Sequence, residues 1–261
     1  MRPARAPFGL AALAAATLAC AAPPAERAAV PAGDFTPVVA PGNDVKSVHV
    51  APFAIDRRPV TNASFLAFVK AHPPWRKGAV PALLADGQYL AHWAGAVELG
   101  ATTSAEQPVT RVSWFAARAY CANEGGRLPT WYEWEYVAAA DETRADARQD
   151  PAFRERILSW YAVPASRPLP PVGKTPTNLY GVQDLHGVIW EWVEDFGGMM
   201  ISGDSRTQGD PDKLQFCGAG ALSAEIRDDY PILMRMALLS SLEANFTTSN
   251  LGFRCAYGAT P

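Results

Sequence analysis

Apolar and polar positions predict a strand and then a helix early in the chain. Residues 48–55 (VHVAPFAI) alternate apolar side chains with others, which is typical of a strand. Thr61 or Asn62 is a good N-terminal cap for a helix, and the apolar side chains at 65, 66, 68 and 69 give that helix one hydrophobic face. The first regular elements are therefore expected between residues 48 and 70.

Two more helices are predicted further along. After a short strand-like segment at 109–112, Ser113 caps a helix that two consecutive glycines end. Thr130 and Glu133 form a capping box, in which the hydroxyl and the carboxylate satisfy free backbone amides reciprocally. The helix that begins there is expected to run to about Ala140.

Long segments without hydrophobic periodicity separate these elements. Residues 72–106 predict surface loops, residues 141–157 an exposed charged loop with one helical turn, and residues 159–176 an extended, proline-rich surface segment. Residues 199–213 predict a further loop, and residues 250–255 a closing strand. We therefore expect short regular elements joined by much irregular chain.

The stretch 178–196 (NLYGVQDLHGVIWEWVEDF) concentrates the candidate chemistry. Asp184 and Glu191 can supply carboxylates to one point, and carbonyl groups around Gly187 and Ile189 can complete an oxygen cage. Calcium takes about six to eight oxygens of this mixed kind. The alternative is a half-buried strand in which two tryptophans share one face and Glu191 pairs with an arginine.

Composition limits the class of protein. Of 261 residues, 49% are hydrophobic and 10% aromatic, so the chain is globular and long enough for one large domain or two small ones. Its net charge of −3 gives no general electrostatic reason for binding nucleic acid. The 23 prolines and 20 glycines agree with a fold rich in turns and loops.

The N-terminus predicts export. Residues 1–20 combine a basic start, an apolar run and small residues, as in a signal peptide, and the run is too short to span a bilayer comfortably. Residues 17–20 resemble a bacterial lipoprotein box, in which Cys20 would be lipidated; the alternative is ordinary cleavage near Ala21. We expect a periplasmic protein, in the first case anchored to the outer membrane, which touches the membrane only through that lipid.

A domain boundary and a cysteine count follow from this interpretation. Residues 21–44, rich in Ala and Pro, predict a linker, and residues 45–261 the folded domain. With Cys20 assigned to processing, Cys121, Cys217 and Cys255 remain. An oxidising compartment favours one disulfide, which leaves one thiol over.

Four separated segments carry a family resemblance. They are PVTNASFLAFV, PVTRVSWFAARAYCANEGGRLPTWYEWEYVAAA, NLYGVQDLHGVIWEW and NLGFRCA, and with their order and spacing they cover about residues 48–257. Together they resemble the formylglycine-generating enzyme, or sulfatase-modifying factor, family. The resemblance implies a single, irregular α+β domain related to C-type lectins.

The resemblance also implies two structural sites. By the family's pattern, a calcium ion is bound by Asp184, Gly187, Ile189 and Glu191, and a disulfide joins Cys121 to Cys255. The family's other ion loop falls in a region that is shortened here, so no second ion is expected.

The resemblance fails at the family's catalytic site. Active members bind copper(I) through two cysteines and oxidise a substrate cysteine to formylglycine with oxygen, but the matching positions here are Ile226 and Pro231. Copper is therefore not expected, and Cys217 is only a weak candidate for a catalytic thiol. The sulfoxide-synthase branch is excluded, because it needs an extra domain with an iron-binding histidine set and the chain has 4 histidines.

These observations lead to three functional hypotheses. The first is an exported family member without formylglycine-generating activity, which acts as an accessory or maturation factor on a periplasmic protein or peptide; family analogy with relatives encoded beside denitrification enzymes suggests a copper or haem enzyme as this client. The second is a divergent copper- and oxygen-dependent oxidase that uses Cys217 on a cysteine or another protein or peptide substrate. The third, a lectin-like binding module, depends on the fold alone.

Overall fold

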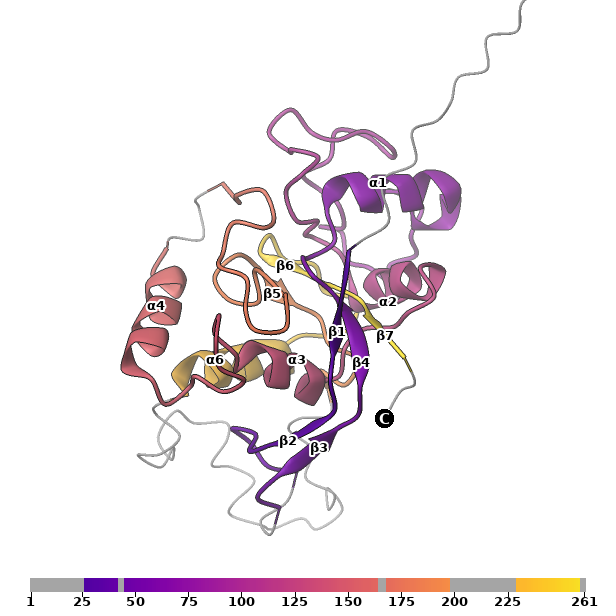
Figure 1. Cartoon of the computed structure of the whole chain (residues 1–261). Coiled ribbons are helices and arrows are strands. Elements are labelled where there is room, and N and C mark those ends of the chain that lie inside the picture. Colours follow the sequence, from indigo (N-terminus) through magenta and orange to yellow (C-terminus); the bar gives the residue numbers. More distant parts are fainter. Residues whose placement is uncertain (1–25, 42–44, 164–167, 198–228, 259–261) are drawn as a thin grey trace, which may run out of the picture.

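The computed structural model describes residues 26–41, 45–163, 168–197 and 229–258. In these ranges the chain forms short strands and five α-helices joined by long irregular segments (Figure 1). The strands are β1 Arg27–Val30, β2 Gly33–Phe35, β3 Val48–Val50, β4 Phe53–Asp56, β5 Trp190–Glu191, β6 Leu251–Gly252 and β7 Ala256–Tyr257. The helices are α1 Asn62–Ala71, α2 Trp114–Asn123, α3 Trp131–Ala138, α4 Pro151–Tyr161 and α6 Tyr230–Ser240, with a 3-10 turn η1 at Pro73–Trp75.

Three small sheets join distant parts of the chain. The first has the antiparallel order β1-β4-β7, so that Ile55 pairs with Ala28 on one side and with Ala256 on the other. The second pairs β2 with β3, and the third pairs β5 with β6 in parallel. In Figure 1, β5 and β6 lie between the α1 and α2 region and the group formed by α3, α4 and α6.

The linker predicted at residues 21–44 is wrong over its described part. Residues 27–30 form β1, and Ala28, Val30 and Phe35 are buried in the main core. The composition suggested a tether, but the alternation in Arg27–Val30 places two side chains inward, and the backbone of β1 completes the edge of β4. The folded domain therefore begins before residue 45.

The predicted strand at 48–55 is two strands in two different sheets. Val48–Val50 pairs with β2, whereas Phe53–Asp56 pairs with β1 and β7. Pro52 lies between them and has no backbone N–H to donate to a ladder, which explains the break. The segment 109–112 is buried but forms no strand, because Val109 N donates to Val60 and Arg111 N to Thr248, on two separate segments.

Local capping chemistry places the helices as predicted. Thr61 accepts from the backbone amide of Ser64 at the start of α1, Ser113 caps α2, and Thr130 with Glu133 forms the capping box of α3. These helix starts are confirmed, because a capping hydroxyl acts within one turn and needs no tertiary partner.

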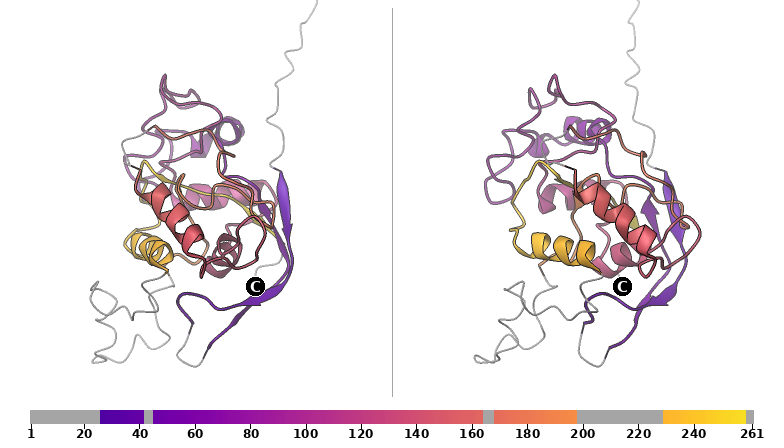
Figure 2. Two further views of the ribbon diagram at one scale, coloured as in Figure 1. Left: turned by 60° about the vertical axis from the view of Figure 1, so that its left-hand side comes forward. Right: turned by 90° about the vertical axis from the view of Figure 1, so that its left-hand side faces the viewer.

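The loop predicted at 141–157 holds as far as residue 150, but its single helical turn is a full helix, and the extended chain predicted from 159 begins only after that helix. Asp150 caps α4, Pro151 occupies its first turn, and the helix continues to Tyr161. Phe153 and Ile157 bury their side chains in a small cluster of their own. Figure 2 shows α4 beside α6 in both views. Phe153 and Ile157 of α4 line a small cavity together with Pro231 and Ile232 of α6.

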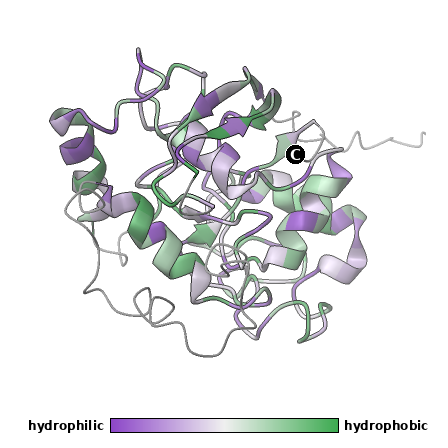
Figure 3. Ribbon diagram, turned by 90° about the horizontal axis from the view of Figure 1, so that it is seen from below, coloured by the Kyte–Doolittle hydropathy of each residue, from purple (hydrophilic) through white to green (hydrophobic). Residues whose placement is uncertain are grey.

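The core is rich in aromatic side chains. Phe65 lies with its ring centroid 5.8 Å from that of Tyr120 and 6.0 Å from that of Phe253. Trp93, in the predicted surface loops at 72–106, is also buried, and its indole N–H donates to Asn62 over 3.1 Å. Figure 3 shows both hydrophobic and hydrophilic segments on the helices, in keeping with helices that each bury one side. Among the described residues, no helix has the length and apolar character needed to cross a membrane.

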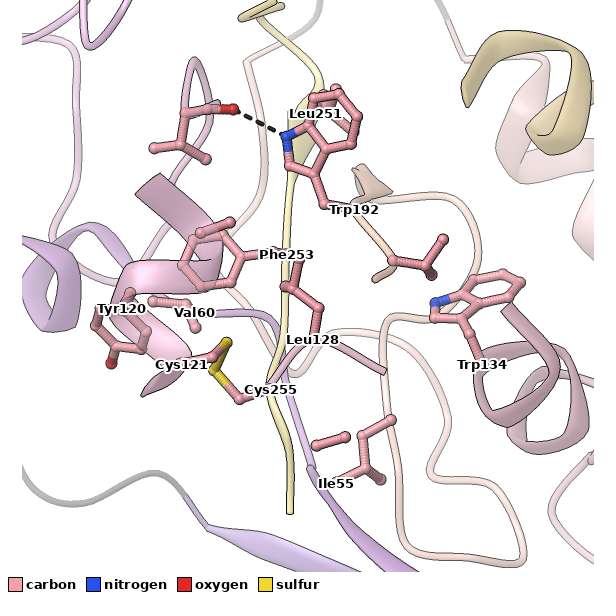
Figure 4. Close-up of a cluster of buried hydrophobic side chains, with 14 of the residues drawn as sticks. Ile55, Val60, Tyr120, Cys121, Leu128, Trp134, Trp192, Leu251, Phe253 and Cys255 are labelled. Atoms are coloured by element: carbon pink, nitrogen blue, oxygen red, sulfur yellow. Dashed lines mark hydrogen bonds between the residues drawn. A yellow bond between two sulfur atoms is a disulfide. The ribbon is translucent and has the colours of Figure 1, made fainter. Parts of the chain in front are cut away.

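A disulfide joins α2 to the C-terminal segment. It links Cys121 and Cys255, the same two cysteines that the family resemblance implies, across 134 positions of sequence. Both residues are fully buried, and Figure 4 shows the bond beside Tyr120, Leu128 and Phe253. The bond therefore fixes the last strand against the middle of the core.

The chain just after β2 is held to α3 by polar groups. The buried carboxylate of Glu135 accepts from Val38 N over 2.6 Å and from the Trp131 indole N–H over 2.8 Å. Arg148 lies 3.4 Å from the same carboxylate and donates to the carbonyl oxygen of Thr36 over 2.8 Å.

We expect the double substitution Cys121→Ala, Cys255→Ala to lower the free energy of unfolding by about 4 kcal/mol, because the bond closes a long loop in the unfolded chain. Urea denaturation of the oxidised protein and the double variant measures this. Cys217→Ser, which leaves the disulfide intact, is the control. A loss below about 1 kcal/mol would contradict the role assigned to the bond.

We also expect Glu135 to make folding dependent on pH. Burial raises the pKa of Glu135 from 4.5 to about 7, although Arg148 opposes the shift; the nearby Asp229 adds to it. The folded protein then holds this proton more tightly than the unfolded chain, so the contribution is complete below about pH 4.5 and is lost as the pH rises through about 7.

The test compares the unfolding free energy of the wild type and Glu135→Gln at pH 5 and pH 8. The wild type should lose on the order of 2 kcal/mol more than the variant over this interval. Buried His186, whose pKa burial lowers to about 4, titrates in both proteins, so the difference isolates Glu135. Equal pH dependence in the two proteins would refute the prediction.

Candidate functional site

A fully buried ion pair lies at the centre of the described structure. Glu191 is in β5, and Arg254 follows β6; both side chains have no exposed surface. Arg254 Nη2 lies 2.8 Å from Glu191 Oε1, and its Nε lies 2.9 Å from Oε2. The indole N–H of Trp134 donates to Oε2 over 2.8 Å. The carboxylate is therefore neutralised and hydrogen-bonded from two separate elements.

The same arginine ties two further segments to this pair. Arg254 Nη1 donates to the carbonyl oxygen of Asp56 over 3.1 Å, and Nη2 donates to that of Gln183 over 2.9 Å. Two residues before Arg254, the backbone of Gly252 approaches that of Val109 closely. An added Cβ at Gly252 would lie 2.2 Å from the carbonyl oxygen of Val109, so this position requires glycine. Residues from the N-terminal sheet, the middle of the chain and the C-terminus thus converge on one guanidinium.

A second buried arginine, from α6, contacts β5. Arg235 of α6 donates to the carbonyl oxygen of Glu191, and its guanidinium stacks 3.8 Å from the ring centroid of Trp134. Burial lowers the pKa of Arg235 to about 10, partly offset by the Glu191 carboxylate. Its Nε has no hydrogen-bond partner among the described residues. The Arg235 side chain is almost fully buried.

Asp184 has a different set of partners from Glu191. Its carboxylate accepts hydrogen bonds from the backbone amides of Gly173, Lys174 and Thr175 and from the Thr175 hydroxyl. Asp184 itself adopts a left-handed backbone conformation, with φ of 60°. The carboxylate therefore organises the turn at 173–175.

As arranged, the predicted calcium ligands do not fit the ion. Each oxygen of Asp184 and Glu191 already accepts N–H or O–H groups, and no partner is common to the two carboxylates. Calcium binding by these residues with Gly187 and Ile189 remains a prediction, and it would require these hydrogen bonds to be exchanged for metal–oxygen bonds. The alternative of a strand in which Glu191 pairs with an arginine describes the structure.

A groove of about 620 Å³ opens beside β5. Most of its described lining is aromatic, aliphatic or proline, and its polar side-chain groups are the Tyr161 hydroxyl, the indole N–H groups of Trp160 and Trp190, the Ser249 hydroxyl and the Asn250 amide. The lining residues are Trp160, Tyr161, Val163, Pro168, Leu169, Pro170, Gly187, Val188, Ile189, Trp190, Met234, Ser249 and Asn250. Its volume lies within the range of about 300–1,000 Å³ that is usual for ligand pockets.

An aromatic pair forms a platform in this groove. The rings of Tyr161 and Trp190 stack with centroids 5.1 Å apart and planes 19° apart. The Tyr161 hydroxyl lies 3.3 Å from His186 Nδ1, and His186 Nε2 lies 3.1 Å from the carbonyl oxygen of Ala138. Because burial keeps His186 neutral, one of its ring nitrogens donates and the other accepts. The platform is therefore held in place from behind.

Glycine is required at position 187, where Trp160 packs closely against the backbone. Gly187 has φ of 83°, and an added Cβ would lie 2.3 Å from Trp160 Cβ. A glycine that seemed a carbonyl ligand from the sequence thus permits the close approach of α4.

The family's copper positions remain without thiols. Pro231, one of the two matching positions, is buried in the first turn of α6; Ile226, the other, lies outside the described residues, as do Cys20 and Cys217. Within the described ranges, both cysteines belong to the disulfide, and no three or more His, Cys, Asp or Glu side chains gather as a metal site requires.

Sequence reasoning missed the contribution of α4 and the partner of Glu191. The Asp150-Pro151 pair is a helix-start signal that would have located α4 and thus Trp160 and Tyr161. Nothing local in the sequence indicates that Arg254, rather than another arginine, meets Glu191.

We expect Glu191→Gln to lower the free energy of unfolding by about 3–5 kcal/mol, because it leaves Arg254 buried without its counter-ion. The loss should be equal in calcium and in chelator. Glu194→Gln, which alters a partly exposed pair with Arg118, is the control and should cost less than about 1 kcal/mol. A loss seen only in calcium buffer would instead show that the predicted ion binds at Glu191.

Comparisons with known proteins agree with one family. A formylglycine-generating enzyme of Streptomyces coelicolor is 31% identical over 260 residues, covering 82% of this chain and 81% of the relative. An "Inactive C-alpha-formylglycine-generating enzyme 2" of Bos taurus is 30% identical over 261 residues, covering 82% of this chain and 80% of the relative. A hercynine oxygenase of Mycobacterium tuberculosis is 30% identical, but only over 56% of this chain and 38% of that protein.

Solved structures also resemble this chain. PvdO from Pseudomonas aeruginosa matches with a TM-score of 0.46 at 20% identity, over 88% of this chain and 93% of the other. The family model for the "Sulfatase-modifying factor enzyme 1-like domain" matches residues 15–259. This match confirms the family that four sequence segments predict: the chain belongs to the sulfatase-modifying factor enzyme 1-like family.

Proposed function

We propose that this protein is an exported accessory or maturation factor, which binds a segment of a protein or peptide partner in the groove beside β5 and does not generate formylglycine. One observation supports the absence of formylglycine-generating activity. The two positions that supply copper thiolates in active members are occupied by Ile226 and Pro231, and neither side chain is a ligand for copper(I).

The groove supports the binding part of the proposal. Its volume suits a ligand, and its aromatic platform is preorganised by His186 and by the backbone of β5. Preorganised aromatic surfaces retain more of their contact energy on binding, because little side-chain freedom is lost. Among the relatives, one is named an inactive member and another a hercynine oxygenase, which is consistent with a family whose members differ in activity.

Location and client rest on the sequence. The signal-like residues 1–20 and the lipoprotein-like Cys20 support export to a periplasm. A periplasmic copper or haem enzyme of denitrification is the client that family analogy suggests.

A divergent oxidase is the second candidate, and Cys217 is the observation in its favour. With Cys121 and Cys255 joined and Cys20 assigned to processing, Cys217 is the thiol that remains. A single thiolate with a methionine could bind copper(I), since soft sulfur ligands suit this ion.

Copper(I) titration with oxygen-uptake measurements distinguishes the two candidates. For the full mature protein and Cys217→Ser, we expect the same copper(I) affinity and no oxygen consumption with cysteine-containing peptides, because a two-thiolate site is absent from the sequence positions that the family uses. Binding that disappears in Cys217→Ser, together with peptide-dependent oxygen uptake, would favour the oxidase. Recovery of a specific periplasmic protein on the immobilised wild type, but not on a variant with Trp190→Ala, would support the accessory role.

A further inference from the structure

We propose that the groove beside β5 selects an uncharged, apolar peptide segment and binds one carbonyl oxygen of that segment through the side-chain amide of Asn250. This inference rests on the proposed function and specifies the chemistry of the partner. The proposed ligand is a peptide; tighter binding of a saccharide or a lipid would contradict the proposal.

The described lining of the groove offers no counter-ion. None of its thirteen residues is Asp, Glu, Lys, Arg or His. A charged side chain placed among Trp160, Trp190 and Leu169 would lose water without gaining an opposite charge, which is costly in an apolar site. An aliphatic, methionine or aromatic side chain would instead bury its surface against the Tyr161–Trp190 platform.

Charged groups lie behind the lining of the groove and not in its described part. Arg254 and Arg235 carry two positive charges, and Glu191 carries one negative charge, all three in fully or almost fully buried positions. Arg235 directly follows Met234, which lines the groove, and its guanidinium and the Glu191 carboxylate both act electrostatically on Tyr161. Asp56 also acts electrostatically on Arg254, and Asp195 acts on Arg235, so positive and negative groups lie together behind the lining. Desolvation is therefore the cost that disfavours a charged partner side chain in the groove.

Asn250 supplies a directed donor in this apolar lining. Its Oδ1 accepts from the Thr248 hydroxyl over 3.2 Å, and its backbone carbonyl oxygen accepts from Trp190 N over 2.8 Å. Its Nδ2 has no hydrogen-bond partner among the described residues, and the side chain lines the groove. With Oδ1 engaged, the amide presents N–H groups, so the complementary group is an acceptor.

A peptide provides both an acceptor for Asn250 and an apolar side chain for the platform. Its carbonyl oxygens are acceptors, and its side chains leave the backbone within one residue of them. A saccharide would instead present many hydroxyl groups to side chains that are mostly aromatic, aliphatic or proline, and an acyl chain would leave Nδ2 without an acceptor. The observations therefore favour an apolar peptide segment.

The test measures binding of acetylated and amidated peptides of the form Gly-Ala-X-Ala-Gly to the full mature protein, by tryptophan fluorescence and calorimetry. We expect peptides with Leu, Met or Phe at X to bind at least about tenfold more tightly than those with Lys, Arg, Asp or Glu, which corresponds to about 1.4 kcal/mol. Equal or tighter binding of the charged peptides would overturn the inference. Binding of none of the peptides at millimolar concentration, or tighter binding of a neutral oligosaccharide or lipid micelle, would overturn it too.

Asn250→Asp tests the donor, because it replaces the amide N–H groups by a carboxylate of nearly the same shape. We expect about tenfold weaker binding of the Leu peptide and a smaller disadvantage for the Lys peptide. Asn123→Asp, an exposed residue at the end of α2 with the same change of charge, is the matched control and should leave both affinities unchanged. Unchanged affinity of Asn250→Asp for the Leu peptide would refute the role of Asn250.

Failure of this inference is distinguishable from failure of the proposed function. Preference for charged peptides, with no oxygen uptake, would overturn the specificity but leave the accessory role. Copper-dependent oxygen uptake with apolar cysteine-containing peptides would overturn the accessory role but leave the specificity.

Discussion

The Glu191–Arg254 ion pair is the interaction on which the other features depend. Neither group has exposed surface, so each carries a desolvation cost that only a close opposite charge and a full set of hydrogen bonds can offset. That requirement brings together β5, the segment after β6, the end of β4 and Trp134 of α3. In a chain with strands as short as two residues, backbone ladders alone offer little to define the arrangement.

The geometry of the groove depends on the Glu191–Arg254 pair. Glu191 is fixed through its carboxylate by Arg254 and through its carbonyl oxygen by Arg235, and the neighbouring Trp190 therefore presents its ring in one orientation. His186 fixes Tyr161 against that ring from the other side. A stretch that looked from the sequence like the ligand set of an ion thus, in the described structure, supports the wall of a mostly apolar groove. Charge lies behind the surface, and the surface itself is uncharged.

Family membership and site chemistry lead to different conclusions about activity. The order of four segments and the family match agree on the fold, because those segments carry the caps, the buried aromatics, the disulfide and the ion pair. By the family resemblance, copper chemistry depends on two thiols, and the matching positions here are Ile226 and Pro231. Membership of the family therefore does not by itself assign its copper chemistry to this chain.

The sequence by itself determined what local chemistry and family pattern control. Helix starts at Thr61, Ser113 and Thr130 were predictable, because a cap satisfies amides within its own turn. The irregular α+β class and the pairing of Cys121 with Cys255 followed from the resemblance. Only the tertiary structure decided that Arg27–Val30 is a strand, that Glu191 faces Arg254 and that α4 meets Gly187. Each of these depends on a partner far away in the sequence, and residue spacing carries no information about which distant group will neutralise a charge or cover a strand edge.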